Sequence, residues 1–212
     1  MAAPARLLAV ALAAVALVAC AHTVTGNAVR PTPGLDDDSR SPVDVDSVLL
    51  GRSRMQAITG AGEHLTVIPS MDGKFPVDID QLAGAVSEQC GWYFAETQTF
   101  GDEIEEFHKT SYQDPPDGAL ISQGAAGYRD QATARRAFDG LAAKIAACES
   151  ADDGMMFVGA LSSREDALSL RTGDCGRDYR VKSVVLVEVT FCHFPSSVPD
   201  IVMTNLLAQI PG

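Results

Sequence analysis

Cys20 constrains this chain more than any other residue, because it closes a short apolar leader. The leader carries Arg6 as its only charge and an apolar core from Leu7 to Val18, which is too short to span a bilayer. It ends in Leu17-Val18-Ala19-Cys20, the pattern of a bacterial lipobox. We therefore predict that residues 1–19 are a signal peptide and that Cys20 becomes a lipidated N-terminus. An ordinary secretory signal with a coincidental cysteine is the alternative.

The charge of the chain limits its partners. It has 28 acidic and 16 basic residues, and loss of Arg6 with the leader changes the net charge from −12 to −13. Nucleic acid needs a surface rich in Lys and Arg, so we exclude it as a partner. The acidity also disfavours adhesion to anionic lipid headgroups. The predicted membrane contact is therefore the lipid anchor alone, on the extracytoplasmic face of the cell membrane.

Two further regions follow the leader. Residues 20–41 contain Pro31, Pro33 and the acidic run Asp36-Asp37-Asp38 but no hydrophobic periodicity, which is typical of a flexible, self-repelling tether. Residues 42–212 are numerous enough for one domain with a sizeable core.

Hydrophobic periodicity in residues 42–212 predicts an α+β fold, with helices at both ends and antiparallel strands between them. Helices are expected at 44–59, at 130–148 and from Ser196 or Ser197 to Ile210, with Asp44 or Asp46 and Gly60 as caps of the first. Strands are expected at 65–68, where Pro69 stops the strand, at 104–112 and 119–129 around a turn at 114–118, and at 155–160 and 167–171. A short helix is expected within 77–86, and 91–100 stays open between helix and strand.

The cysteines give the sharpest geometric prediction. Thiols oxidise outside the cytosol, so the four cysteines other than Cys20 predict two disulfides. A hairpin centred on Ser183-Val184 pairs residues whose numbers sum to 367, which sets Cys175 opposite Cys192 and leaves Cys90 to pair with Cys148. The same register sets three valines opposite polar residues, so we expect a bulge or a shielded edge strand. The three pairs are Val185 with Lys182, Val187 with Arg180, and Val189 with Asp178.

Several segments together resemble the PknH-like extracellular sensor domain family, over roughly residues 42–212. They are Leu49 to Ala61, Cys90 with the aromatic-rich stretch after it, Gly127 to Cys148, Cys175 with Val184 to Val189 and Cys192, and the end of the last helix at Leu207 to Pro211. The family includes lipoproteins without a kinase. The resemblance implies a twisted antiparallel sheet flanked by helices around a cleft, two disulfides, and a role in sensing an envelope ligand. This chain differs from the family in its acidic insert, Gly101 to Phe107.

No catalytic or metal-binding motif is recognisable in the sequence, so we predict neither an enzyme nor a cofactor or metal ion. The acidic residues from Asp102 to Glu106 are interpreted as a solvated strand face, with a patch for a basic partner or a cation as the alternative. A ligand site would use aromatic side chains and a few polar groups. The candidates are Trp92, Tyr93, Tyr112, Tyr128, Arg177 and Tyr179.

The leader and the resemblance together predict a membrane-anchored lipoprotein whose extracytoplasmic domain is a non-catalytic sensor for an envelope ligand. The alternative is a protein–protein interaction module of the cell envelope. A preformed concave pocket would favour the first function, and an exposed apolar patch without a pocket would favour the second.

Overall fold

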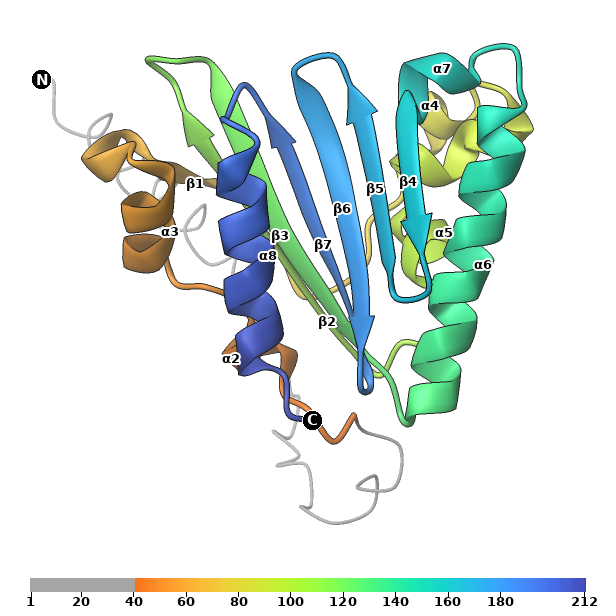
Figure 1. Cartoon of the computed structure of the whole chain (residues 1–212), viewed down its shortest axis with the longest axis horizontal. Coiled ribbons are helices and arrows are strands. Elements are labelled where there is room, and N and C mark those ends of the chain that lie inside the picture. The colour runs from red at the N-terminus through yellow and green to blue at the C-terminus, as the bar shows by residue number, and fades with distance from the viewer. Residues whose placement is uncertain (1–40) are drawn as a thin grey trace, which may run out of the picture. The chain divides into compact units, whose positions relative to one another are not determined.

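Seven antiparallel strands form a single sheet in this computed structural model, which describes residues 41–212. The strand order is β1-β2-β3-β7-β6-β5-β4, and helices lie on both faces of the sheet (Figure 1). The predicted α+β class, a twisted antiparallel sheet flanked by helices, is confirmed. Within residues 41–212, no helix combines the length and the apolar character needed to cross a bilayer.

The elements follow one another along the chain with short connections. The strands are β1 Thr66–Gly73, β2 Glu106–Asp114, β3 Ala119–Gly127, β4 Ala160–Arg164, β5 Ala167–Thr172, β6 Cys175–Lys182 and β7 Val185–Cys192. The α-helices are α2 Val45–Val48, α3 Arg52–Thr59, α4 Asp80–Ala83, α5 Glu96–Phe100, α6 Gln131–Glu149, α7 Gly154–Phe157 and α8 Ser197–Gln209. Two 3-10 helices complete the described chain, η1 Gly62–His64 and η2 Glu88–Phe94.

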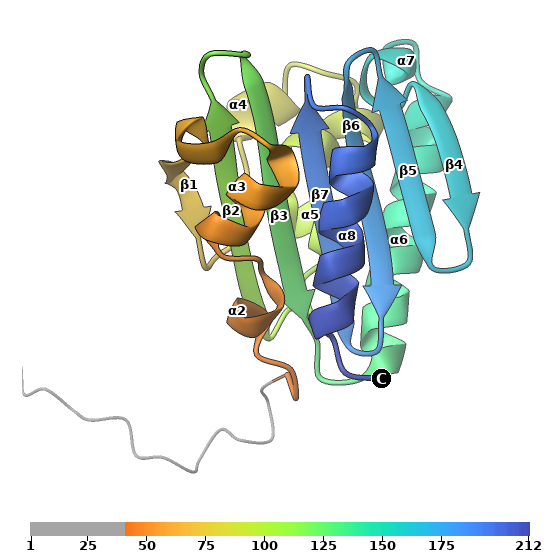
Figure 2. The ribbon, with the colours of Figure 1, turned by 60° about the vertical axis from the view of Figure 1, so that its left-hand side comes forward.

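The sheet separates two hydrophobic cores, because successive side chains of a strand point to opposite faces. On β7, Val185, Val187 and Val189 belong to the core that also contains residues of α2, α3 and α8. Leu186 belongs to the other core, with residues of α6 and η2. Figures 1 and 2 show these helices on the two sides of the sheet. A strand buried on both faces is a near-continuous apolar run, as β7 is.

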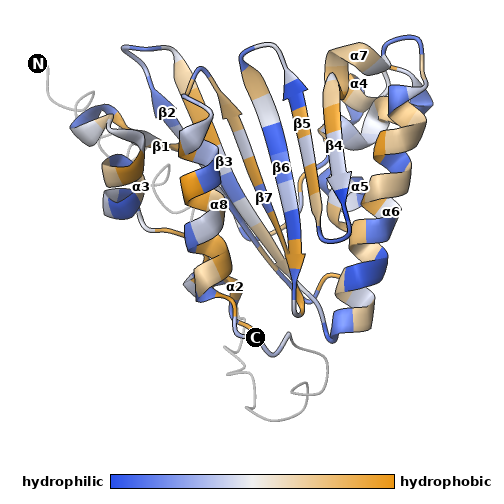
Figure 3. Cartoon of the chain, viewed as in Figure 1, coloured by the Kyte–Doolittle hydropathy of each residue, from blue (hydrophilic) through white to orange (hydrophobic). Residues whose placement is uncertain are grey.

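The hairpin of β6 and β7 has the predicted register. Cys175 lies opposite Cys192, and the pairing continues without irregularity to Lys182 and Val185. The expected bulge or shielded edge strand is absent from this hairpin, and that expectation is wrong: both strands are interior to the sheet. Figure 3 shows the alternation that caused the difficulty, with polar residues along β6 beside the more apolar β7.

Polar side chains of β6 find partners at the C-terminal end of α8, which lies in front of the sheet in Figure 2, and on the neighbouring strand β5. The Lys182 ammonium donates to the carbonyls of Leu207 at 2.8 Å and Ile210 at 2.7 Å, and so caps the C-terminus of α8. Asp178 accepts two hydrogen bonds from the Arg171 guanidinium, at 2.9 and 3.0 Å. These partners satisfy the charges, so the valines opposite them stay buried without a bulge.

The first predicted helix is two helices in the structure, because β2 and β3 interrupt it at Leu50. The Gln123 side chain accepts from the Leu50 N–H at 2.9 Å and donates to the Leu50 carbonyl at 2.6 Å. The Tyr112 hydroxyl donates to the same carbonyl at 3.2 Å. These bonds replace the helical ones at that residue. Asp44 caps α2 through its side chain, and Gly60 ends α3 in the left-handed region, as predicted.

Two strand predictions need correction. β1 continues through Pro69 instead of stopping before it. β1 is an edge strand, and its pairing with β2 is irregular between Val67 and Asp72, where the missing N–H of proline is tolerated.

The apolar run predicted as a strand at 155–160 is instead the helical turn α7 followed by the start of β4 at Ala160. A short apolar run does not distinguish these two structures. The open segment 91–100 is helical, as the end of η2 followed by α5.

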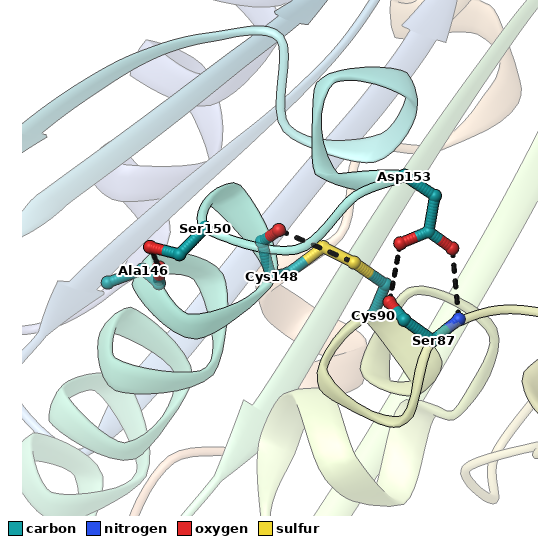
Figure 4. The surroundings of a disulfide bond; sticks show 6 residues. All are labelled: Ser87, Cys90, Ala146, Cys148, Ser150 and Asp153. Atoms are coloured by element: carbon teal, nitrogen blue, oxygen red, sulfur yellow. Dashed lines mark hydrogen bonds between the residues drawn. A yellow bond between two sulfur atoms is a disulfide. The ribbon is translucent and has the colours of Figure 1, made fainter.

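Both predicted disulfides are present. Cys90–Cys148 joins η2 to the last turn of α6, and Cys175–Cys192 joins β6 to β7. Figure 4 shows the surroundings of the first bond, where the Asp153 carboxylate accepts from the N–H of Ser87 at 2.9 Å and from its hydroxyl. The disulfide and this carboxylate together hold η2 against the end of α6.

Candidate functional site

Trp92, Tyr112 and Tyr128 are packed in the cores, and Tyr179 is a fourth core residue among the six predicted ligand-binding residues. Tyr112 belongs to the core beneath α8, and Trp92 and Tyr128 belong to the core beneath α6. The Tyr128 hydroxyl donates to the Phe100 carbonyl at 2.6 Å, and burial raises the pKa of this tyrosine. Packing accounts for the positions of Trp92, Tyr112 and Tyr128, and contact with a ligand stays a prediction for them.

The other three candidates, Tyr93 on η2 and Arg177 and Tyr179 on β6, meet between η2 and the sheet. The Arg177 guanidinium lies over the Tyr93 ring, 3.6 Å from its centroid. Tyr179 is fully buried and is the cross-strand neighbour of Glu188. We call these three residues, with Lys109 and Glu188, the charged cluster.

Glu188 is the buried centre of the charged cluster, with 1% of its surface exposed. It accepts hydrogen bonds from Lys109 Nζ and from the Thr190 hydroxyl, each at 2.9 Å. Burial raises the pKa of Glu188, but the charges of Lys109 and Arg177 and these hydrogen bonds outweigh burial and hold the pKa at about 2. Glu188 is therefore ionised at neutral pH, and the ion pair with Lys109 is intact there.

Two polar atoms of the charged cluster, the Tyr179 hydroxyl and Arg177 Nε, are buried and have no hydrogen-bond partner among residues 41–212. Burial, followed by the charge of Glu188, raises the pKa of Tyr179 well above its usual value. Tyr179 therefore stays protonated at neutral pH and remains a hydrogen-bond donor. The cluster thus has hydrogen-bonding capacity that its own residues leave unused.

Glu96 connects the charged cluster to the molecular surface. One oxygen of its carboxylate lies 2.9 Å from Lys109 Nζ, and the other accepts from the Val77 N–H at 2.8 Å. The Glu96 N–H donates to the Val77 carbonyl at 3.2 Å, and the Ile79 N–H donates to the Phe94 carbonyl at 2.8 Å. The buried charges therefore hold α5 and the segment between β1 and α4 in place next to β2.

A cavity of about 620 Å³ opens at this edge of the sheet, and we call it the edge groove. It lies between α2, the connection that follows β1, α5 with the loop after it, and the start of β2. Its apolar lining is Val45, Phe75, Pro76, Ile104 and Phe107. The volume is within the usual range for ligand pockets.

Carboxylates dominate the polar lining of the edge groove. They are Asp44, Asp46, Asp102, Glu105 and Glu106, with Lys74 as the one cation in the lining. The hydrogen bond from the Lys74 ammonium is the main reason that the pKa of Asp46 is lowered. His108 Nδ1 lies 2.8 Å from Asp46 and His108 Nε2 lies 3.1 Å from Asp72, so this ring links the α2 wall to β1.

The groove differs from the site that the sequence predicted. Its lining includes none of the six candidate residues. The acidic insert forms one wall of the groove. Of its acidic residues only Glu106 belongs to a strand, so the interpretation of Asp102 to Glu106 as a strand face is wrong for the others. Sequence reasoning missed Phe75, Glu96 and Lys109, which carry no local signal. Glu188 does carry one, since it is a single carboxylate inside an apolar strand.

The described residues contain no group of His, Cys, Asp and Glu side chains arranged to hold a metal ion. The groove offers carboxylates, apolar side chains and backbone groups at the start of β2. Such a lining suits binding of a cationic or mixed polar and apolar group.

Residues 41–207 match the family described as PknH-like extracellular domain. Among solved structures, the crystal structure of the extracellular domain of PknH from Mycobacterium tuberculosis is similar, with a TM-score of 0.55. The two sequences are 14% identical, and the match covers 80% of this chain and 97% of that chain. At this identity the likeness shows the fold alone. No curated protein matches the sequence.

Proposed function

The chain belongs to the family of PknH-like extracellular domains, and on that premise we propose that it is a lipid-anchored, non-catalytic binding protein on the outer face of the cell membrane. The observation that carries the proposal is the preformed edge groove, about 620 Å³ in volume and lined by both carboxylates and apolar side chains. A groove whose walls are fixed by buried charges is suited to ligand binding, because little ordering is needed when a ligand enters.

The lipobox supports the anchoring part of the proposal. In this proposal residues 1–19 are removed as a signal peptide, Cys20 carries the lipid, and residues 20–41 are the tether of the domain. All but Ser41 of these residues lie outside the described residues. The change Cys20→Ala should move the protein from the membrane fraction to the soluble extracytoplasmic fraction, while Thr23→Ala should not. Mass spectrometry of an uncleaved, unmodified N-terminus in the native cell would overturn this part.

The non-catalytic part rests on the chemistry of the groove. Its lining has carboxylates, one lysine and one threonine but no histidine, cysteine or serine. Paired carboxylates alone can perform acid–base chemistry, yet the Asp46 pKa is lowered, which opposes a role as a general acid near neutral pH. Binding is the function that this lining supports best.

A specific observation also favours the interaction module that the sequence offered as the alternative. Five large apolar side chains are exposed within Met71 to Leu82, and Phe75 is 81% exposed. Exposed apolar patches mark interaction surfaces. The structure thus contains both a pocket, which favours ligand binding, and an exposed apolar patch, which favours protein interaction. The two features adjoin at Phe75.

The decisive experiment compares bound molecules in two variants of the protein purified from the native envelope. Thr97→Trp places a large side chain in the groove wall, and Ser162→Trp places the same side chain on exposed β4 as the matched control. Native mass spectrometry should detect a copurified molecule with the natural protein and with Ser162→Trp but not with Thr97→Trp. Equal occupancy in both variants, or none in any of them, would contradict binding in the groove.

A further inference from the structure

The exposed apolar segment beside the edge groove is held rigidly in place. Val77 is 59% exposed and Phe75 is 81% exposed, although the backbone around them is fixed. Gly73 pairs with Lys109 before them, and the backbone N–H and carbonyl of Val77 bond to Glu96 after them. These apolar side chains therefore stay exposed in the folded domain, because local rearrangement would break the pairing on both sides.

β2 has an unpaired edge next to these side chains. β1 pairs with β2 only as far as Gly73 with Lys109, whereas β3 pairs with β2 over its whole length. Within residues 41–212, Glu106, Phe107 and His108 have a strand partner on one side only. A free strand edge presents N–H and carbonyl groups that can pair with a further chain. This edge lies in the groove, since Glu106 and Phe107 line it.

The charge of the groove selects the chemistry of the occupant. Carboxylates lie on both sides of the β2 edge, with Asp44 and Asp46 on α2 and Asp102 in the loop after α5. Lys74, the cation of the lining, is already paired with Asp46. A negative groove attracts positive side chains and repels negative ones.

From these features we propose that the edge groove binds an extended, basic polypeptide segment, which adds to β2 as a further strand. Backbone hydrogen bonds to Phe107, whose N–H and carbonyl point away from β3, provide affinity that is independent of sequence, as in other cases of strand addition. Lys or Arg side chains, which alternate between the two faces of the added strand, meet the α2 carboxylates on one face and Asp102 on the other. Apolar side chains of the segment pack on Phe75. This inference rests on the proposed function, because it names the class of ligand for the same groove.

Other occupants fit the groove less well. A second copy of this chain carries the same net charge of −12, so its approach to an acidic groove is unfavourable. The chain's own residues 21–40 carry Asp36, Asp37 and Asp38 against Arg30 and Arg40, which gives a net negative segment. Anionic lipid headgroups and nucleic acid are excluded by the same charge argument.

The test uses the detergent-purified lipoprotein and three synthetic peptides, read by fluorescence anisotropy. The first peptide has seven residues with Lys or Arg in adjacent pairs between valines, so that basic side chains point to both faces of the added strand. The second replaces every basic residue by Glu, and the third places Pro in the centre of the first. We expect the basic peptide to bind at least tenfold more tightly than either of the others, since Glu reverses the charge and Pro removes a donor from the added strand. Equal binding of the Pro peptide, or full competition by spermine, would overturn strand addition.

Matched charge reversals locate the site. Asp102→Lys in the groove should weaken binding of the basic peptide at least tenfold, whereas Asp174→Lys, which changes the net charge equally on the exposed β5–β6 turn, should leave it within twofold. Hydrogen exchange should slow at the amide of Phe107 when the peptide binds, because this N–H faces the free edge. Equal weakening by both variants would mean that only the overall charge matters, and would overturn the site.

The peptide experiment and the copurification experiment can fail independently of each other. If a copurified molecule is lost in Thr97→Trp but the basic peptide does not bind, the groove is a ligand site and the peptide inference is wrong. If a copurified molecule is lost in Thr97→Trp, the peptide binds and Asp102→Lys weakens that binding, both hold. If neither the copurified molecule nor the peptide is found, both fail.

Discussion

The two edge regions of the sheet differ in how easily a further strand could pair with them. The β4 edge is five residues long and exposes Ser162, Ser163 and Arg164, so it is short and polar. The opposite edge exposes Phe75 and Val77 and leaves the start of β2 unpaired beside a groove. Short, polar, charged edges are a usual protection against unwanted pairing. The contrast indicates that one edge is protected and the other is kept open for binding.

Two buried carboxylates in the interior of the sheet, Asp178 on β6 and Glu188 on β7, are paired with cations from opposite sides of the sheet. On the β4 side, Asp178 is held by Arg171, whose side chain is 34% exposed. On the groove side, Glu188 is held by Lys109, whose side chain is 17% exposed and lies between Glu188 and Glu96. Water can replace Arg171 more easily than Lys109. The open edge therefore depends more strongly on its buried ion pair than the protected edge does.

The largest expected effect comes from the covalent links. The change of Cys90 and Cys148 to Ser opens a loop of 58 residues and should lower the free energy of unfolding by about 4 kcal/mol. The same change at Cys175 and Cys192 opens a loop of 17 residues and should cost about 3 kcal/mol. Guanidinium unfolding measures both. A larger loss from the second pair would contradict the view that the long cross-link, which holds η2 beside the groove, is the more important.

Removal of Lys109 comes next. In Lys109→Ala, Glu188 stays buried without its nearest cation, and we expect a loss of about 3 kcal/mol in the free energy of unfolding, since Arg177 still offsets part of the charge. Arg171→Ala, the matched change near the protected edge, should cost about 1 kcal/mol, because water reaches Asp178 once the half-exposed Arg171 is gone. Equal losses in the two variants would remove the energetic difference between the edges.

Acid should weaken the open edge through Glu188. Its pKa is lowered from 4.5 to about 2, so its stabilising contribution is fully present above pH 4.5 and is lost as the pH falls toward 2. This contribution is on the order of 3 kcal/mol. Urea unfolding between pH 6 and pH 2.5 should therefore show a shallower fall in stability for Glu188→Gln than for the natural protein. Parallel curves would show that Glu188 titrates normally.

The smallest effect is expected at the apolar side chains of the two edges. Phe75→Ser should change the free energy of unfolding by less than about 0.5 kcal/mol, because Phe75 is 81% exposed. Leu161→Ser on β4 should cost about 1–2 kcal/mol, because Leu161 packs against the core beneath α6. Thermal unfolding compares the two variants. A large loss in Phe75→Ser would mean that this ring is structural rather than available for binding.

The β6–β7 hairpin was predictable from sequence because its determinants are local. Two cysteines and a short turn define the register of residues that are neighbours along the chain. The break at Leu50 was not predictable, because it depends on Gln123, 73 residues away. The periodicity on both sides of Leu50 is helical and gives no sign of that distant side chain.

The candidate site was less predictable than the fold for the same reason. Lys109 and Glu188 are separated by 79 residues, and the wall of the edge groove comes from four separate parts of the chain. Sequence reasoning selected aromatic residues, and four of them proved to be core residues. The acidic insert was noticed as a departure from the family, yet its position on the wall of a groove follows only from the fold.

The position of α8 has a consequence for how the domain forms during synthesis. The valines of the central strand β7 are covered by the final helix, and the C-terminus of that helix is capped by Lys182. A polypeptide that emerges N-terminus first cannot close this core until α8 has appeared. The domain should therefore remain loosely packed until α8 has emerged, and then complete its core in one late step.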